Sequence, residues 1–181
     1  MLKSIARNRI RAFSKHYDYD ASYMDMVLDA SPAAFFKFAK LVDAASHRES
    51  APIDAYYAAK IAGACVEDCG PCTQLTVNMA LEAGMSRDQI EAVLTCDFEI
   101  MNDDTVLGFR FAQAVIDRAA NEAELRDAVR TVWGDKGVID LTFALQLGRM
   151  FPMVKAGLGF AKECRRVIVG DKAVEVARLA A

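Results

Sequence analysis

The sequence has few cysteines, no long apolar run and no basic excess, and each shortage excludes a class of protein. Five cysteines among 181 residues are too few for a disulfide scaffold, and their number is odd. This usage favours a reducing compartment, so we expect a cytoplasmic protein. No apolar run of roughly 18 residues occurs, so no membrane contact is expected. The formal net charge of -3 gives no support to nucleic-acid binding, whose footprint is strongly basic.

A convincing alternating strand pattern is also missing, as are a Gly/Ser linker and a fixed-period repeat. Almost every segment instead carries apolar residues at helical spacing, and short turns separate these segments. The sequence therefore predicts one all-α domain over residues 1–181. Within it, residues 1–19 are expected to form a basic, helical N-terminal arm that docks on the body or on another subunit.

Helix starts are the clearest local signals. Ser31 is expected to cap a helix that opens with a proline, and Ser86 with Gln89 has the spacing of a capping box. Further N-caps are expected within 102–104 and at Asn121. These signals divide the chain into helices of ordinary length.

Glycine and proline mark the expected helix ends. Gly84 follows a helical segment as a C′ residue, and Gly134 is expected to stop another helix. Pro152, Gly157 and Gly159 are expected to interrupt or kink the last helical segment.

Three of the five cysteines lie in one short stretch, where Cys69 and Cys72 enclose Gly-Pro and Cys65 precedes them. CGPC is the thioredoxin sequence, but thioredoxin requires a preceding strand, and the residues before Cys69 are helical in pattern. C-x3-C-x2-C is an iron–sulfur spacing, yet the chain lacks the strands of such enzymes and a further ligand pair for zinc. An inert pair of buried thiols is the third alternative.

A reactive dithiol is the leading interpretation of Cys69 and Cys72. Two cysteines separated by Gly-Pro at a helix start are close enough to form a disulfide. The free N–H groups and the positive dipole end of a helix N-terminus also stabilise a thiolate. We therefore predict that these two residues form a reversible disulfide.

The cysteine pair is followed by Gly84, twelve residues after Cys72, and then by MSRDQI, a polar cap before the next helix. This block, Cys69 to Ile90, resembles the core of the alkylhydroperoxidase D–like, carboxymuconolactone decarboxylase superfamily, and the resemblance extends loosely over residues 20–160. It implies an all-α homo-oligomer, a dimer, trimer or hexamer, that needs no cofactor. It also implies a peroxidatic Cys72 and a resolving Cys69, whereas in thioredoxin-type motifs the first cysteine attacks.

The chain departs from this family at two positions. The family histidine falls at Thr76, and the family glutamate, twelve residues before the first cysteine, falls at Tyr57. The usual proton relay is therefore not intact. Glu67 is the best local candidate for a catalytic base, followed by Asp54, and the alternative for Glu67 is a solvated acid at a helix end.

The remaining candidates are expected to be structural or solvated. His16 and His47 lie in polar segments and are interpreted as surface histidines. Cys96 and Cys164 are interpreted as structural thiols in helical runs.

The sequence thus predicts a thiol peroxidase with Cys69, Cys72 and Glu67 as its catalytic residues. Its expected partners are a peroxide or another small molecule, a dithiol reductant and further copies of the chain. A non-enzymatic redox sensor or binding module is the alternative. A decarboxylase-type enzyme of the same superfamily is disfavoured by the cysteine pair and the missing histidine.

Overall fold

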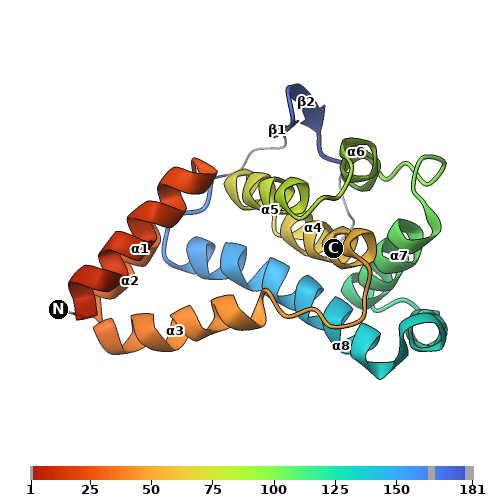
Figure 1. The fold of residues 1–181 in the computed structure, drawn as a ribbon, viewed down its shortest axis with the longest axis horizontal. Coiled ribbons are helices and arrows are strands. Elements are labelled where there is room, and N and C mark those ends of the chain that lie inside the picture. The colour runs from red at the N-terminus through yellow and green to blue at the C-terminus, as the bar shows by residue number, and fades with distance from the viewer. Residues whose placement is uncertain (1, 163–165, 178–181) are drawn as a thin grey trace.

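The structure, a computed structural model, describes residues 2–162 and 166–177. Helices surround a central helix, and one small hairpin lies near the C-terminus (Figure 1). The elements are α1 (Leu2–Tyr17), α2 (Ser22–Ala30), α3 (Pro32–Ala44), α4 (Ile53–Val66), α5 (Gly70–Glu82), α6 (Arg87–Thr95), α7 (Asp103–Asp117), α8 (Glu122–Gly157), β1 (Arg166–Val169) and β2 (Lys172–Glu175). The expected all-α fold is confirmed.

Helix α4 forms the middle of the core. Alanine dominates its sequence, which favours helix, and its small side chains let neighbouring helices approach on several faces. A Cβ on Gly63 would collide with the carbonyl oxygen of Leu145 in α8, and one on Gly108 of α7 would collide with the backbone of Ala55. Close backbone contact, rather than large side chains, therefore holds α7 and α8 against α4.

A buried carboxylate on α8 organises the start of α4. Asp140 is fully buried, and its Oδ2 accepts hydrogen bonds from the backbone N–H groups of Glu49 at 3.0 Å, Ser50 at 2.7 Å and Ala51 at 2.9 Å. Three donors converging on one carboxylate satisfy a buried charge. Asp140 thereby fixes the turn before α4 from a residue about ninety positions away.

Three of the expected N-caps are confirmed. The side chains of Ser31, Ser86 and Asn102 accept from backbone N–H groups three residues on, at 3.3, 3.3 and 2.8 Å. The reciprocal half of the capping box does not form, because the Gln89 side chain bonds instead to the backbone at Ile100 and Asn102. Asn121 holds the expected N-cap position of α8, but its side chain makes no capping hydrogen bond.

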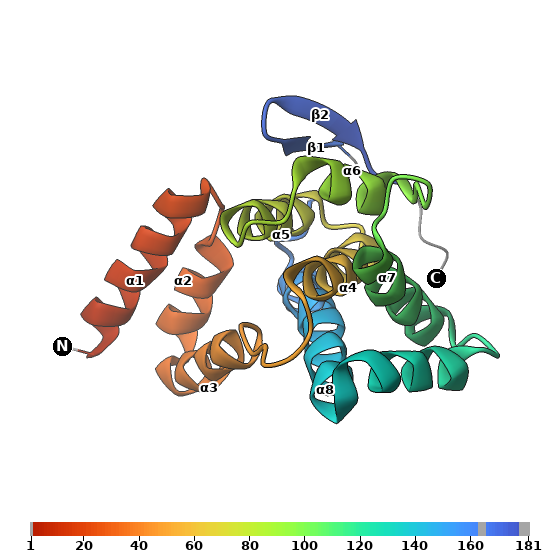
Figure 2. The same ribbon diagram turned by 45° about the vertical axis from the view of Figure 1, so that its right-hand side comes forward.

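The expected helix ends agree with the structure less well than the expected N-caps do. Gly84 has the positive φ of 97° expected of a C′ residue, and Gly134, with φ 69°, breaks α8 into two arms that Figure 2 shows at a sharp angle. Pro152 does not interrupt the second arm, which runs on to Gly157. Its missing N–H is therefore accommodated within the helix.

The expectation that no strand occurs is wrong for residues 166–175. There β1 and β2 pair antiparallel, Val167 opposite Val174, and both of these side chains are buried. Gly170, with φ 67°, forms the turn. The hairpin lies above α5 and α6 (Figure 2) and leaves the helical class unchanged.

The N-terminal arm docks on the body. The end of α1 approaches α5 (Figures 1 and 2), where the hydroxyl of Tyr17 donates to Glu82 at 2.5 Å and His16 lies 3.1 Å from the same carboxylate. Next to this contact the chain turns into α2 through Asp18, at φ 49°. Among the described helices, none is both long and apolar enough to cross a bilayer.

Candidate dithiol site

The cysteine pair lies at the junction between α4 and α5. Glu67 ends α4, Asp68 turns the chain at a φ of 49°, and Cys69 occupies the N-cap of α5 with Pro71 in the first turn. The carbonyl of Cys69 accepts from the N–H of Cys72 at 3.0 Å, which closes the first turn. The sequence places both thiols at a helix N-terminus, as expected.

The two sulfurs lie 2.7 Å apart, and both thiols are free and buried. A disulfide requires about 2.05 Å, so bond formation needs a movement of only about 0.7 Å. The hydrogen bond from Cys72, with a smaller contribution from the Lys155 ammonium, lowers the pKa of Cys69 to about 6. The pKa of Cys72 is raised, first by its hydrogen bond to Cys69 and then by burial. The shifts make Cys69 the more acidic thiol of the pair.

Sequence reasoning missed two residues that reach this pair. Tyr19, in the turn between α1 and α2, has its hydroxyl 3.8 Å from Cys72 Sγ. Lys155, on α8, has its Nζ 3.4 Å from the Tyr19 hydroxyl and only 1% of its surface exposed. The one available signal was an isolated lysine in the otherwise apolar segment around Lys155, since nothing local links Tyr19 to Cys72.

The backbone holds Tyr19 firmly in this position. Its N–H donates to the carbonyl of Ser14 at 2.9 Å, and its carbonyl accepts from the Ser14 hydroxyl at 2.6 Å. Burial raises the pKa of Tyr19 far above its ordinary value, so the phenol keeps its proton. Tyr23 of α2 is buried beside it, and burial also raises the pKa of Tyr23.

The predicted base Glu67 is part of an ion pair. Its carboxylate accepts from Nε of Arg149 at 2.8 Å, and both side chains are only partly exposed. The second candidate, Asp54, accepts from the Asn102 side chain at 2.7 Å. Both carboxylates are therefore engaged by other groups, and their role as a base stays a prediction.

Thr76 and Tyr57, which stand where the family has its histidine and glutamate, make other contacts. The Thr76 hydroxyl donates to the carbonyl of Cys72 at 3.0 Å, one helical turn back. Tyr57 packs edge-on against Tyr56, with Nζ of Lys60 5.7 Å from its ring. Thr76 and Tyr57 thus belong to the helical framework around the dithiol.

Cys65 and Cys96, the two other described cysteines, are less acidic than an ordinary thiol. Burial raises the pKa of Cys65 to about 12 despite a hydrogen bond with Thr73, and burial also raises the pKa of Cys96. In the described part of the chain, no three side chains of His, Cys, Asp or Glu come together as ligands for a metal. Cys164 lies outside the described residues.

The two histidines lie toward the surface, as expected. The side chain of His16 is 59% exposed and that of His47 is 37% exposed. His47 lies 3.6 Å from the carboxylate of Asp140 and beside Phe143, so it covers the buried carboxylate rather than the dithiol.

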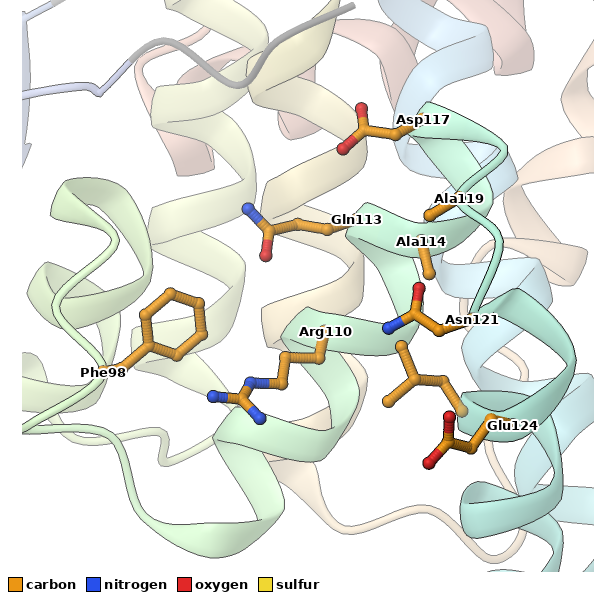
Figure 3. A pocket seen from close by; sticks show the side chains of 9 residues that line it. Phe98, Arg110, Gln113, Ala114, Asp117, Ala119, Asn121 and Glu124 are labelled. Carbon is orange, nitrogen blue, oxygen red and sulfur yellow. The ribbon is translucent and has the colours of Figure 1, made fainter.

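An open hollow lies between α7, the start of α8 and the loop before α7 (Figure 3). Its volume is about 380 Å³, and Arg110 lies over the ring of Phe98 at its edge, 5.1 Å from the centroid. Asp117 and Glu124 line the opposite part. None of the residues that line this hollow belongs to the dithiol site.

Comparison with known proteins assigns neither a family nor a function to the chain. No protein-family model matches the chain, and no match was found among curated proteins or solved structures. The resemblance to the alkylhydroperoxidase D–like superfamily therefore rests on the sequence pattern, which is specific from Cys69 to Ile90 and loose over residues 20–160.

Proposed function

We propose that the protein is a thiol peroxidase that reduces a small hydroperoxide through a Cys69–Cys72 disulfide cycle. The observation that carries this proposal is the 2.7 Å separation of two free sulfurs, one of them with a strongly lowered pKa. Low-pKa thiolates beside a resolving thiol are the cysteines that peroxides oxidise.

The cycle has three balanced steps. The Cys69 thiolate attacks the O–O bond of ROOH, so that Cys69 becomes a sulfenic acid and the leaving RO⁻ takes a proton to give ROH. Cys72 then attacks the sulfenic sulfur, the S–S bond forms, and hydroxide leaves with the Cys72 proton as water. A cellular dithiol reduces the disulfide by exchange and is itself oxidised.

We assign the attack to Cys69, the first cysteine, rather than to Cys72 as the family resemblance implies. The lowered pKa of Cys69 supports this order, because only the thiolate is nucleophilic. Cys69 is 1% exposed and Cys72 5% exposed, which favours hydrogen peroxide or a short alkyl hydroperoxide over a bulky one.

The test is peroxide consumption by the reduced protein in the presence of a dithiol. We expect Cys69→Ser and Cys72→Ser to abolish turnover, and Cys96→Ser to turn over like the wild type. Thiol counting after mild oxidation should find two fewer free thiols in the wild type and no such loss in Cys72→Ser. If Cys69 and Cys72 stay free while Cys96 or Cys164 oxidises, the proposal is wrong.

The burial of both sulfurs also favours a second candidate, a redox sensor that reacts once and is not turned over. In this function the disulfide changes an oligomer contact. Several large apolar side chains on α3 and α8 are exposed and suit such a contact: Phe36, Val42, Ile139 and Phe143. Size measurement of the reduced and oxidised protein distinguishes the two: a change of oligomer without catalytic turnover identifies the sensor.

The same exposed side chains support a homo-oligomer in either function. We propose that the protein works in the reducing cytoplasm, where a dithiol pool keeps the pair reduced. Light scattering of the reduced protein tests the assembly, and a monomer at cellular concentration would contradict it.

A further inference from the structure

We propose that Lys155 and Tyr19 compensate for the missing histidine and glutamate by stabilising the thiolates of the pair. Lys155 supplies the positive charge for the thiolate, and Tyr19 donates a hydrogen bond to Cys72 Sγ as that sulfur loses its proton. This inference rests on the proposed dithiol cycle and adds the residues that drive its second step.

The hydrogen bonds between these groups run in one direction. An ammonium has donors only, so Lys155 Nζ, 3.4 Å from the Tyr19 hydroxyl, must donate to it. The hydroxyl hydrogen of Tyr19 then has two acceptors in reach, Cys72 Sγ at 3.8 Å and the Tyr23 hydroxyl, and it turns to the sulfur when that sulfur becomes negative. Both Tyr19 and Lys155 act to lower the pKa of Cys72, against the stronger effects of Cys69 and burial.

Lys155 is a buried charge with weak partners. Its other hydrogen bond goes to the backbone carbonyl of Asp20 at 3.3 Å, and its Nζ lies 4.4 Å from the ring centroid of Tyr19 and 5.6 Å from that of Tyr23. Among the described residues, the ion pairs give it no carboxylate within 4 Å; the Asp20 carboxylate pairs with Lys162 at 3.7 Å and interacts with the Lys155 charge from farther away. A buried charge ordinarily has a counter-ion. The thiolate of the dithiol meets this need.

This arrangement acts on the resolving step. Cys72 holds its proton in the resting pair and must give it up to attack the sulfenic acid of Cys69. The Tyr19 hydrogen bond and the Lys155 charge stabilise the Cys72 thiolate at that moment. Once the disulfide has formed, the negative charge is gone and Lys155 has lost its counter-ion, so the same lysine favours return to the reduced state.

The groups that face the two sulfurs come from several elements. Tyr19 lies in the turn after α1, Tyr23 on α2, Lys155 on α8, and the backbone N–H of Lys162 donates to Cys69. The pKa values found by a pH titration of the dithiol therefore depend on these four residues. Among the described residues, Lys155 is the only buried ammonium at this site.

Lys155→Met tests the charge while keeping an apolar side chain of similar length. The thiolate is followed by its ultraviolet absorbance and by the rate of alkylation with iodoacetamide across pH. We expect the apparent pKa of Cys69 to rise by about one unit from about 6, which is roughly tenfold less thiolate near pH 5 and about twofold less at pH 7. Lys40→Met, which removes an exposed lysine of α3, should titrate like the wild type. A wild-type titration curve for Lys155→Met overturns the charge role, and Lys155→Arg should restore most of the shift.

Tyr19→Phe tests the hydrogen bond and keeps the packed ring, so it reports on Tyr19 even if Lys155→Met does not fold. We expect disulfide formation to slow about tenfold, the value of one hydrogen bond to a charged sulfur. Cys69 alkylation should stay within about twofold of wild type, and a sulfenic-acid trap such as dimedone should label more Cys69. Disulfide formation at the wild-type rate overturns the role of Tyr19.

These readouts separate the two proposals. If the wild type consumes no peroxide but the titration depends on Lys155, the peroxidase function fails and the charge role stands. If peroxide turns over while Lys155→Met and Tyr19→Phe both behave like the wild type, the inference fails and the function stands.

Discussion

Two buried charges on α8, Asp140 and Lys155, have very different surroundings. Asp140 accepts three short backbone hydrogen bonds at one oxygen, of 2.7 to 3.0 Å. Lys155 has two long bonds, of 3.3 and 3.4 Å, to uncharged oxygens. Asp140 is therefore satisfied by the folded chain itself, whereas Lys155 has weak hydrogen bonds, no carboxylate within 4 Å among the described ion pairs, and a thiolate that can form beside it. The comparison suggests that the first charge serves the fold and the second serves chemistry.

The largest expected effect is on the fold. Asp140→Ala leaves the N–H groups of Glu49, Ser50 and Ala51 without their acceptor, and we expect the free energy of unfolding to fall by about 3 kcal/mol. Denaturant titration of the reduced protein measures it. Asp127→Ala removes an exposed carboxylate from the same helix and should change stability little. If Asp140→Ala and Asp127→Ala were equally stable, the structural role of the Asp140 carboxylate would be contradicted.

The next effect is a pH dependence of stability. The folded-state pKa of Cys69, about 6, lies below its ordinary value of 9.0, so the folded state loses this proton first. The thiolate stabilises the fold fully above the ordinary thiol pKa, and this contribution is lost as pH falls through about 6.

Reduced wild type should therefore gain stability over Cys69→Ser between pH 6 and 8, by about 1 kcal/mol or more. The raised pKa of Cys72 opposes this gain only above the ordinary thiol range, so the measurement should stop at pH 8. The same difference at both pH values would contradict the lowered pKa of Cys69.

A smaller effect is expected when the second buried charge is removed. Lys155→Met replaces a poorly bonded ammonium with an apolar chain, and such replacements are often neutral or stabilising. We expect the free energy of unfolding at pH 5, where the thiols are protonated, to change by less than about 1 kcal/mol. A loss as large as that of Asp140→Ala would mean that Lys155 is structural.

The smallest effect is expected at Glu67. Its pair with Arg149 is partly exposed, so Glu67→Gln should alter stability little. If Glu67 is the base, peroxide turnover falls strongly while the disulfide still forms. If Tyr19 and Lys155 instead stabilise the Cys72 thiolate without a base, turnover of Glu67→Gln is unchanged or faster. The assay therefore distinguishes catalysis by Glu67 from stabilisation by Tyr19 and Lys155.

The sequence predicted well those features that depend on residues close together in the chain. Ser31, Ser86 and Asn102 cap their helices because the acceptor and the N–H lie three residues apart. The Cys69–Cys72 proximity follows equally from one turn of chain. The short strands of residues 166–175 were missed because four residues carry too little alternation to be recognised.

The residues around the dithiol could not be found in this way. Tyr19 and Cys72 are 53 positions apart, and Tyr19 and Lys155 are 136 positions apart. Their contacts depend on how α1, α5 and α8 pack, which no motif of a few residues encodes. The family pattern directed attention to Thr76 and Tyr57 instead, and neither position supplies the expected group.

The wide separation of Tyr19 and Lys155 has a consequence for biosynthesis. A ribosome makes Tyr19 before the cysteine pair and Lys155 well after it. A nascent chain that has not yet emerged past α8 carries both cysteines without the ammonium. Its thiols then lack the effect by which Lys155 lowers their pKa values. The charge that makes the pair acidic therefore reaches it only after α8 has been made and has packed on the rest of the fold.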